Sequence, residues 1–258
     1  RRNQGRDDRY VPEFLFYANE AVDANRLQSV LHEWKKRSKV VITRHNLAPH
    51  NHKLEGSNLY EIVYSLVDGI VHMGNCSNNE FKTSELFSEL IHNTVIPHHV
   101  YDSDLRFAES MKSKKQRQEY VLVFGRIRNK EERSLIKKAT YYLKKKKIKV
   151  VVPSWRIFEE SRRRNPIKWM LFELSFLFEN FFSTMELGNR YVNKEVTSNL
   201  FYNSLMVLVP RVNSLNSGIV TQAFAYSKVI VGTEKGNIGE LLKESGNPVF
   251  NLEQRESL

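Results

Sequence analysis

The chain has 258 residues, enough for two domains of ordinary size, and its apolar fraction of 41% is that of a globular protein. Forty Lys and Arg against 29 Asp and Glu give a formal charge of +11, which predicts an anionic partner such as a nucleotide diphosphate, a lipid phosphate, a membrane surface or a nucleic acid. The single cysteine, Cys76, excludes an intrachain disulfide framework and agrees with a reducing compartment.

The first nine residues contain four arginines and no apolar core of the kind that a secretory signal peptide needs, so we expect a cytoplasmic protein. The longest apolar run, residues 169–182, contains Glu173 and Glu179. It is shorter than the roughly 20 residues that a membrane-spanning helix requires. We therefore predict no transmembrane segment.

The first half of the chain alternates helical and strand patterns. Apolar residues between 14 and 34 recur mostly at three- and four-residue steps, which predicts a helix, and a buried strand follows at 39–43. The alternation continues with a helix at 59–67, a strand at 69–73, a helix at 80–90 and a strand at 95–101. Strands that alternate with helices are typical of a parallel sheet in the α/β class.

Histidines stand at two strand ends in this half. His45 follows the strand at 39–43, where a histidine either serves a ligand or satisfies a loop carbonyl, and the residue types alone favour the second role. His98 and His99 are adjacent on a strand, so their side chains project in opposite directions. No third ligand is spaced to help them, and we expect no metal site.

A polar and charged stretch, residues 110–119, separates the two halves of the chain. Domain boundaries fall in such stretches because few contacts cross them. We therefore predict an N-terminal domain at 1–112 and a C-terminal domain at 113–258.

The C-terminal half begins with a buried strand at 120–124, which leads into a loop that contains Arg128 and Lys130. A basic loop that leaves a buried strand favours phosphate binding over a merely solvated turn, because a planar guanidinium matches phosphate oxygens. A helix at 131–147 and a strand at 149–152 follow.

Three consecutive arginines, Arg162 to Arg164, precede an apolar and aromatic segment that begins at Trp169. We favour a core helix with a solvated basic cap, which is the commoner arrangement. The alternative is docking on an anionic membrane that carries a lipid-linked acceptor.

Residues 206–240 are the most informative stretch. They contain a strand pattern, a polar loop, a helical pattern and a second strand pattern, which together make half of a parallel-sheet repeat. Asn216, Ser217 and Gly218 stand where the loop enters the helix, and the free N–H groups of a helix start attract anions. Gly218 also removes a side chain where a phosphate would need close approach to the backbone.

These residues carry a resemblance to a known family. The blocks NSG at 216–218, QAFAYSKVIV at 222–231 and GNIGE at 236–240 are similar to the donor-binding block of bacterial glycosyltransferases with the two-Rossmann-domain (GT-B) fold. The retaining family-four type and the related capsule-polysaccharide enzymes resemble the chain most. FGRIRNK at 124–130 is similar to the turn that holds the donor diphosphate in that family, and TRHN at 43–46 to the segment with a histidine facing the donor sugar.

The resemblance implies an α/β protein with two Rossmann-like domains facing across a cleft. The N-terminal, acceptor-side domain is expected to be incomplete, because nothing before residue 14 matches the first strand and Gly-rich turn of the family. The C-terminal domain would bind the nucleotide sugar. The implied activity is transfer of a sugar to a glycan or lipid-linked acceptor in polysaccharide biosynthesis, without a metal or other cofactor.

The resemblance also assigns roles to residues. Arg128, Lys130 and the N–H groups after Asn216, those of Ser217 and Gly218 included, would bind the donor diphosphate. Gln222 would hydrogen-bond a ribose or sugar hydroxyl, since an amide both donates and accepts. His45 is the candidate general base if the reaction inverts the anomeric centre.

The family has two glutamates at the positions that Ser214 and Gln222 occupy here. This leaves a catalytically idle homologue that binds the donor or assists a partner transferase as one rival. A nucleic-acid-binding module is a second rival, supported by the positive charge and eleven tyrosines. Because the Lys and Arg scatter or cap helices instead of interleaving with aromatic residues on one surface, we expect no nucleic-acid partner.

Overall fold

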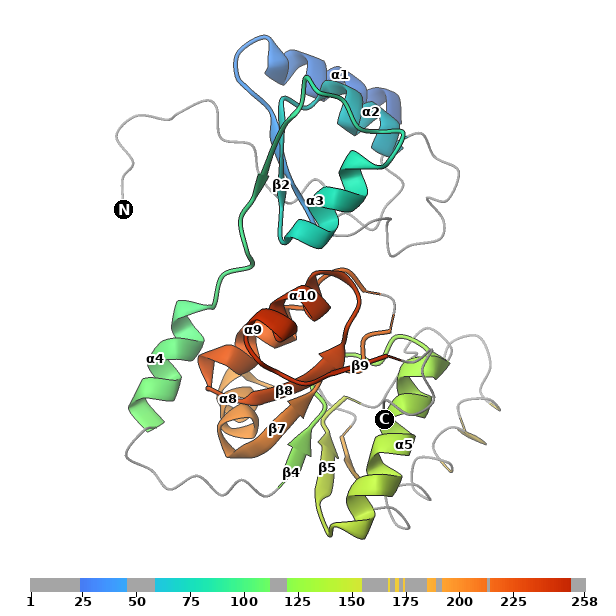
Figure 1. Ribbon diagram of the computed structural model, residues 1–258, viewed down its shortest axis with the longest axis vertical. Helices are drawn as coiled ribbons and strands as arrows, with labels where there is room; N and C mark the ends of the chain where they lie inside the picture. Colours follow the sequence, from blue (N-terminus) through green and yellow to red (C-terminus); the bar gives the residue numbers. More distant parts are fainter. Residues whose placement is uncertain are drawn as a thin grey trace. The chain divides into compact units, whose positions relative to one another are not determined.

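The computed structural model describes residues 24–45, 59–111, 120–154, 167, 170, 171, 174, 185–188, 192–212 and 214–251. The chain divides into two compact units, residues 1–97 and 98–258. Each unit has its own parallel sheet and its own hydrophobic core (Figure 1).

Among its described residues, the first unit contains a three-stranded parallel sheet of order β1-β2-β3. Its elements in chain order are α1 (Ala24–Lys35), β1 (Val41–Arg44), α2 (Leu59–Leu66), β2 (Gly69–His72), α3 (Asn75–Lys82) and β3 (His92–Val95). The register pairs Arg44 with His72 and His72 with Val95, so the last residues of the three strands lie side by side at one edge of the sheet. The core of this unit forms because Leu27 and Leu31, one helical turn apart on α1, bury together with apolar residues of α2 and β2.

The helix predicted at 80–90 is wrong in position. The helix there is α3, which begins after Gly74 and ends before Thr83. Leu86 and Phe87, which suggested a helical pattern, pack against the same core from a non-helical segment, while Leu90 is exposed. Periodicity misled because a turn placed the two apolar side chains on the core without a helix.

The second unit contains β4 to β9 in its described part, joined in one parallel sheet of order β6-β5-β4-β7-β8-β9. Counted from its first strand, this is the order of the doubly wound Rossmann sheet. The elements are α4 (Asp102–Met111), β4 (Tyr120–Leu122), α5 (Lys130–Lys145), β5 (Lys149–Val152), β6 (Met185–Leu187), α8 (Lys194–Asn203), β7 (Ser204–Leu208), α9 (Gly218–Ala225), β8 (Val229–Thr233), α10 (Gly236–Glu244) and β9 (Val249–Phe250). The sequence patterns indicated most of these, but not α4, β6, α10 or β9.

Helices cover both faces of this sheet. Val121 and Val123 belong to a core that includes Leu135 of α5, whereas Leu122 between them belongs to a second core that includes Ala223 of α9. Helix α5 therefore lies on one face, and α4, α8, α9 and α10 lie on the other (Figure 1). A strand buried on both faces is apolar throughout, which explains the continuous apolar run at β4.

Helix α4 packs on the second unit. Tyr226, at the end of α9, donates its hydroxyl to Asp104 Oδ1 over 3.3 Å, and the ring of Phe107 contacts the Tyr226 ring with centroids 6.5 Å apart. The hydroxyl of Tyr202 donates to the carbonyl of Met111. The contacts therefore divide the chain after Pro97, whereas composition placed a boundary later, at 110–119, because composition carries no information on where α4 packs.

Within the described ranges, none of the helices combines the length and the apolar character that a membrane span needs. Arg162 to Arg164 and Trp169 lie outside the described residues. Four residues that follow the three arginines, at positions 167, 170, 171 and 174, are helical.

Candidate functional site

The second sheet reverses its strand order between β4 and β7. From β4 the chain continues through β5 to β6 on one side, and then returns to β7, which pairs with β4 on its other side. The loops after β4 and β7 consequently diverge at their carboxyl ends, and ligands of open α/β sheets bind at such a crevice. The residues that follow these two strands form the candidate site.

Gly125 brings the loop after β4 close to α9. Its φ of 87° lies in the left-handed region that glycine adopts without strain. A Cβ on Gly125 would also lie 2.6 Å from Ile219 Cδ1 and 3.2 Å from Arg211 Nη2. The backbone conformation therefore favours glycine at this position, and a larger residue would also have to displace the ends of the Ile219 and Arg211 side chains.

A buried ion pair fixes the same two loops to one another. Arg211, which follows β7, donates from Nη1 to Glu132 Oε2 over 2.8 Å and to the carbonyl of Arg126 over 2.9 Å. Arg211 and Glu132 are only 4% and 2% exposed. Glu132 Oε2 also accepts the backbone N–H of Arg128 over 2.8 Å. One carboxylate of α5 thus holds both the loop after β4 and the residue that follows β7.

The Arg128 side chain extends toward the loop before α9. Its Nη1 donates to Ser214 Oγ over 3.0 Å, and Ser214 Oγ donates in turn to the carbonyl of Asn216 over 3.0 Å. Desolvation and the charge of Arg211 lower the pKa of Arg128, and the charge of Glu132 opposes them. An arginine nevertheless remains charged at neutral pH, so this edge of the sheet presents an exposed cation near a second, buried one.

Asn216, Ser217 and Gly218 form the start of α9. Ser217 is the N-cap residue, with an extended backbone and no side-chain capping hydrogen bond. The first N–H groups of a helix lack intrahelical acceptors, and the helix dipole makes them favourable for an anion. The sequence predicts these three residues as donor-binding, and the structure connects the first of them, Asn216, to Arg128 through Ser214.

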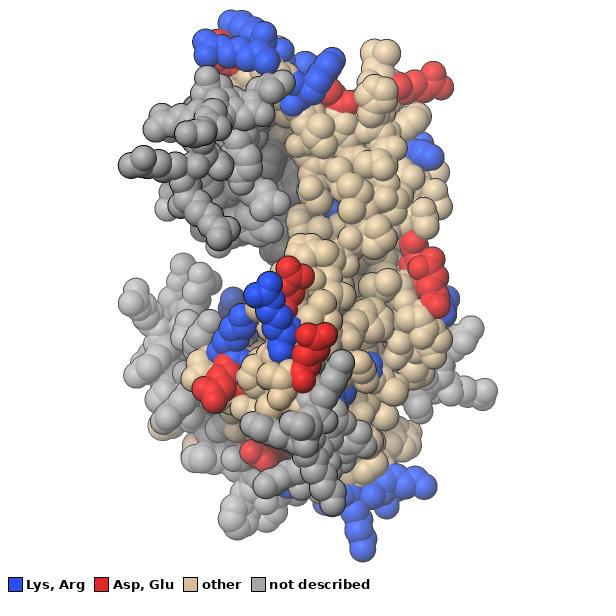
Figure 2. Space-filling model, turned by 90° about the vertical axis from the view of Figure 1, so that its left-hand side faces the viewer, with Lys and Arg blue, Asp and Glu red and all other residues tan. Residues whose placement is uncertain are grey.

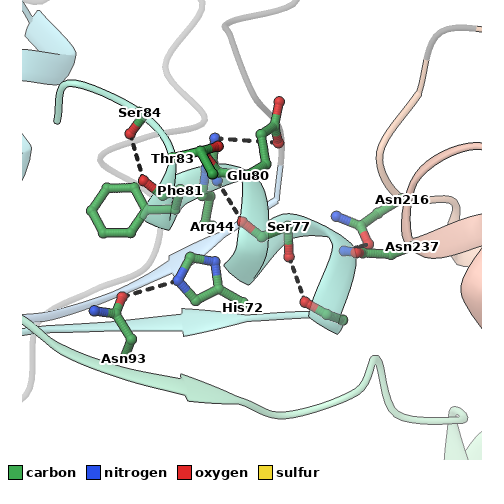
Figure 3. Close-up of polar contacts among 11 residues, drawn as sticks. Arg44, His72, Ser77, Glu80, Phe81, Thr83, Ser84, Asn93, Asn216 and Asn237 are labelled. Carbon is green, nitrogen blue, oxygen red and sulfur yellow. Dashed lines mark hydrogen bonds and ion pairs between the residues drawn. The ribbon is translucent and has the colours of Figure 1, made fainter. Parts of the chain in front are cut away.

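Two residues of α10, Gly236 and Asn237, pack against this loop. Asn237 donates from Nδ2 to Asn216 Oδ1 over 2.9 Å (Figure 3). Gly236 has a φ of 66°, and a Cβ there would lie 3.1 Å from the carbonyl oxygen of Leu215. The sequence indicated the block 236–240 only as part of a motif, and the support that it gives to Asn216 became visible in the tertiary contacts.

Lys130 is the first residue of α5, and Gln222 lies in the second turn of α9. Lys130 is exposed and follows the N-cap Asn129, whose side chain accepts the Glu132 N–H over 2.8 Å. Gln222 is partly buried and stands one helical turn after Gly218, on the same side of α9. Both residues thus belong to helices that begin at the carboxyl edge of the sheet, and their donor-binding roles stay predictions.

Further groups beside α9 were missed by sequence reasoning. His98 Nδ1 lies 3.4 Å from Thr221 Oγ1, and a Cβ on Gly218 would lie 3.9 Å from His98 Nε2 and 3.7 Å from the hydroxyl of Tyr101. The sequence treated His98 only as a poor metal ligand. The strand predicted at 95–101 is wrong in position, because β3 ends at Val95 and His98 lies beyond it, and the sequence offered no signal that this histidine packs against a helix more than a hundred residues later.

His45 belongs to the first unit. It follows β1 directly and is partly buried. Its neighbour Arg44 donates from Nη1 to the carbonyl of Ser77 over 2.8 Å, and its Nη2 lies 3.6 Å from Glu80 Oε2 (Figure 3). The guanidinium also lies 5.7 Å from the centre of the Phe81 ring. Arg44 thus fastens α3 to the end of β1, next to His45.

His72 ends β2 at the same edge and is fully buried. Its Nε2 lies 3.1 Å from Asn93 Oδ1, and its ring packs 5.6 Å from the centre of Phe81 (Figure 3). Burial lowers the pKa of His72, with the Asn93 hydrogen bond opposing and the charge of Arg44 adding to the effect. His72 is therefore a neutral, structural member of the core at neutral pH.

The arrangement in the second unit can bind an anion. Positive charge comes from Arg128 and Lys130, and backbone donors come from the start of α9. Among the residues that the structure describes, no group of three or more His, Cys, Asp or Glu is arranged to hold a metal ion. The geometry suits a diphosphate, which accepts hydrogen bonds from several directions.

The two parallel sheets define an α/β protein with two Rossmann-like units, and its fold is that of the GT-B glycosyltransferases. No protein-family model matches the sequence, and no curated protein matches it either. The fold assignment made from the sequence is confirmed by solved structures.

One such structure is a UDP-forming α,α-trehalose-phosphate synthase from Burkholderia xenovorans, at 16% identity and a TM-score of 0.57 over 87% of this chain and 59% of that chain. Another is the trehalose-6-phosphate structure from E. coli bound with UDP-2-fluoro glucose, at 14% identity and a TM-score of 0.57 over 90% of this chain and 61% of that chain. A third is the catalytic domain of starch synthase IV from Arabidopsis thaliana bound to ADP and acarbose, at 11% identity and a TM-score of 0.52 over 95% of this chain and 57% of that chain. The chain thus spans about three fifths of the chains that it resembles, and the likeness establishes the fold alone.

Proposed function

We propose that the chain is a glycosyltransferase that moves a sugar from a nucleotide-sugar donor to a glycan or lipid-linked acceptor. The observation that carries the proposal is the meeting of Arg128 with the loop before α9, through Ser214, at the point where the sheet reverses its strand order. The solved structures that share the fold include proteins bound with UDP-2-fluoro glucose and with ADP. A donor diphosphate at this edge is consistent with both lines of support.

In the proposed reaction, the bond between the sugar and the diphosphate breaks and negative charge grows on the departing phosphate. Arg128, Lys130 and the first N–H groups of α9 would stabilise that charge. They are held in place before the reaction by the Glu132–Arg211 ion pair and by Asn237, so little reorganisation is needed when the charge develops. Because these groups supply the positive charge, we propose that the enzyme needs no metal or other cofactor.

Gln222 of the second unit and His45 of the first unit have separate proposed roles. The Gln222 amide would hydrogen-bond a hydroxyl of the ribose or the sugar, and it cannot act as a base. His45, from the first unit, would accept the proton of the attacking acceptor hydroxyl in an inverting reaction.

The proposal includes the finer class that the sequence resemblance implies. We propose a cytoplasmic bacterial enzyme of the family-four-like, capsule-polysaccharide type, working on a glycan or lipid-linked acceptor. Peripheral contact with the inner membrane surface belongs to the same proposal, because a lipid-linked acceptor is reached there.

A second candidate is a catalytically idle homologue that binds the donor. The observation that favours it is at Ser214, where the resembled family has a glutamate. Here a hydroxyl bridges Arg128 and the Asn216 carbonyl, so the residues proposed to bind the donor lack that carboxylate.

A thermal-shift panel of nucleoside diphosphates and their sugars tests donor binding, because a ligand that binds only the folded chain raises its melting temperature. We expect one nucleotide family to stabilise the wild type. Arg128→Ala should weaken binding about ten- to a hundred-fold, since it removes a charged hydrogen bond of roughly 1.5–3 kcal/mol. Arg106→Ala is the matched control, because Arg106 is an exposed arginine on α4 of the same unit.

The outcomes separate the candidates. A nucleotide response that Arg128→Ala loses and Arg106→Ala keeps supports the donor site. Slow hydrolysis of the stabilising nucleotide sugar then identifies a transferase, whereas binding without turnover on any acceptor identifies the idle homologue. Equal responses in both variants would refute the assignment of Arg128.

A further inference from the structure

The outer side of α5 and the turn after it carry an unusual concentration of charge. Residues 137–149 contain seven lysines and no acidic residue, so these thirteen positions hold +7 against a net +11 for the whole chain. All seven lysines are exposed. The sequence had indicated scattered basic residues, but α5 places its lysines on the outer side, because the inner side packs on the sheet through Leu135, Ile136 and Thr140. Four of the seven lysines belong to α5 and two follow its end, whereas Lys149 begins β5 and pairs with Glu186 over 3.3 Å.

Two tyrosines stand among these lysines. Tyr141 and Tyr142 are 62% and 55% exposed, and their rings meet edge to face with centroids 5.7 Å apart. The Lys145 ammonium lies 5.0 Å from the centre of the Tyr141 ring and 5.9 Å from that of Tyr142. Exposed aromatic rings of this size cost free energy in water, and together with lysines they are typical of a surface that meets a membrane interface.

Other charged regions of the molecule differ from this one. On the face shown in Figure 2, the Lys and Arg side chains lie in separate groups, and those in its middle have Asp or Glu beside them. In the first unit, Lys36 and Lys39 likewise have the acidic partners Glu33 and Asp68. Lys149 pairs with Glu186 in the same way, so the contrast rests on the lysines of α5 and of the turn after it, which stand with two exposed aromatic rings in a stretch, 137–149, that contains no acidic residue.

An exposed apolar row belongs to the same side of the sheet. Ile167, Met170, Leu171 and Leu174 are helical, stand at the i, i+3, i+4 and i+7 positions of one helical face, and are 66%, 53%, 58% and 56% exposed. They lie in the connection from β5 to β6, which runs in the same direction along the sheet as the connection from β4 to β5. Right-handed crossovers place both connections, and so both exposed rows, on the α5 side.

We propose that this side of the second unit docks on an anionic lipid bilayer, with the α5 lysines on lipid phosphates and Tyr141, Tyr142 and the apolar row at the level of the headgroups. Charge complementarity identifies the occupant as anionic. The apolar row favours a bilayer over a nucleic acid, because a polyanion would leave four large apolar side chains in water. The outer side of α5 is also the convex surface of one helix, whereas proteins that bind single-stranded nucleic acids hold the phosphate backbone in a groove.

Docking along α5 has a consequence for the site. The helix has sixteen residues and is roughly 24 Å long, and it begins at Lys130, directly after the loop that carries Arg128. A helix lying flat on the bilayer keeps that loop near the lipid headgroups. A lipid-linked acceptor would then be presented beside the site, a consequence that rests on the proposed function, whereas docking itself does not.

Co-sedimentation of the full chain with vesicles tests the proposal, using phosphatidylcholine alone and phosphatidylcholine with phosphatidylglycerol. The wild type should bind only the anionic vesicles. Replacing Lys144, Lys145, Lys146 and Lys147 by Gln should weaken binding about five-fold per charge, so more than roughly a hundred-fold in total. Tyr141→Ser with Tyr142→Ser should weaken it about ten-fold without changing the charge.

The matched control removes four lysines elsewhere. Lys36, Lys39, Lys194 and Lys243 are all exposed, and their joint replacement by Gln should leave most of the vesicle binding intact. Equal losses in the two lysine variants would show that net charge alone is at work and would overturn the proposal. No binding of the wild type to anionic vesicles, equal binding to neutral ones, or tighter binding to single-stranded RNA that depends on the two tyrosines would overturn it as well.

Donor binding and membrane docking fail separately. The lysine variant of α5 should keep the melting temperature and the nucleotide response of the wild type, because none of its four substitutions lies near Arg128 or α9. Loss of vesicle binding with an intact nucleotide response therefore reports on docking alone.

Discussion

The Glu132–Arg211 ion pair gives the sharpest test of how the candidate site is built. Glu132→Gln keeps the shape of the side chain and removes its charge, which leaves the Arg211 guanidinium buried at 4% exposure without a counter-charge. Breaking a buried pair from one side costs roughly 3–5 kcal/mol. For a unit of this size, 1 kcal/mol corresponds to roughly 2–4 °C, so the melting temperature should fall by roughly 6–20 °C.

Urea unfolding followed by circular dichroism measures the free energy, and two further variants make the result specific. Glu131→Gln changes the exposed neighbour on the same helix and should shift stability by no more than about 0.5 kcal/mol. Glu132→Leu combined with Arg211→Met removes both charges and should recover most of the stability, because no buried charge is left unpaired.

Although its stability recovers, the double variant should bind nucleotide more weakly than the wild type. It lacks the bonds from Arg211 to the Arg126 carbonyl and from the Arg128 N–H to Glu132, so the loop after β4 is no longer held. Stability with weak donor binding would show that the pair positions the loop. A Glu132→Gln variant as stable as Glu131→Gln would refute the reasoning. A double variant whose loss of stability equals the sum of the losses from Glu132→Leu alone and Arg211→Met alone would refute it as well.

Two other predictions concern buried titratable groups. Tyr226→Phe should cost roughly 1–3 kcal/mol, because it leaves buried Asp104 without the tyrosine hydroxyl. Burial raises the pKa of Tyr226 to about 12, so from about pH 10 the unfolded chain loses this proton while the folded chain keeps it. The stability of the wild type should therefore fall between about pH 10 and about pH 12, and that of the Phe variant should fall less steeply. Urea unfolding at alkaline pH measures both. Burial lowers the pKa of His72, so below about pH 6.5 the unfolded chain binds a proton that the folded chain does not, and stability should decrease with falling pH. His72→Leu should reduce this pH dependence, whereas replacement of the exposed His92 by Leu should leave it unchanged, as urea unfolding at pH values on either side of 6.5 would show. If stability changed equally with pH in both variants, the dependence would not come from His72.

The sequence by itself determined the class of fold and the main loops of the site. Buried strands of a parallel sheet are apolar along their whole length, so β4 and β7 could be recognised from a few consecutive residues. The glycine and the basic residues that follow such strands, Gly125 and Arg128 among them, are local signals as well, since a turn and its chemistry occupy neighbouring positions.

Only the tertiary structure decided which of those groups act together. Arg128 reaches Ser214 across 86 positions of the chain, and Glu132 pairs with Arg211 across 79. In the sequence Glu132 is an ordinary acid at the start of a helix, and the residues of α4 fall within the predicted first domain. Periodicity reports on neighbours within one strand or one helical turn, whereas partners this distant are set by how the sheet orders its strands.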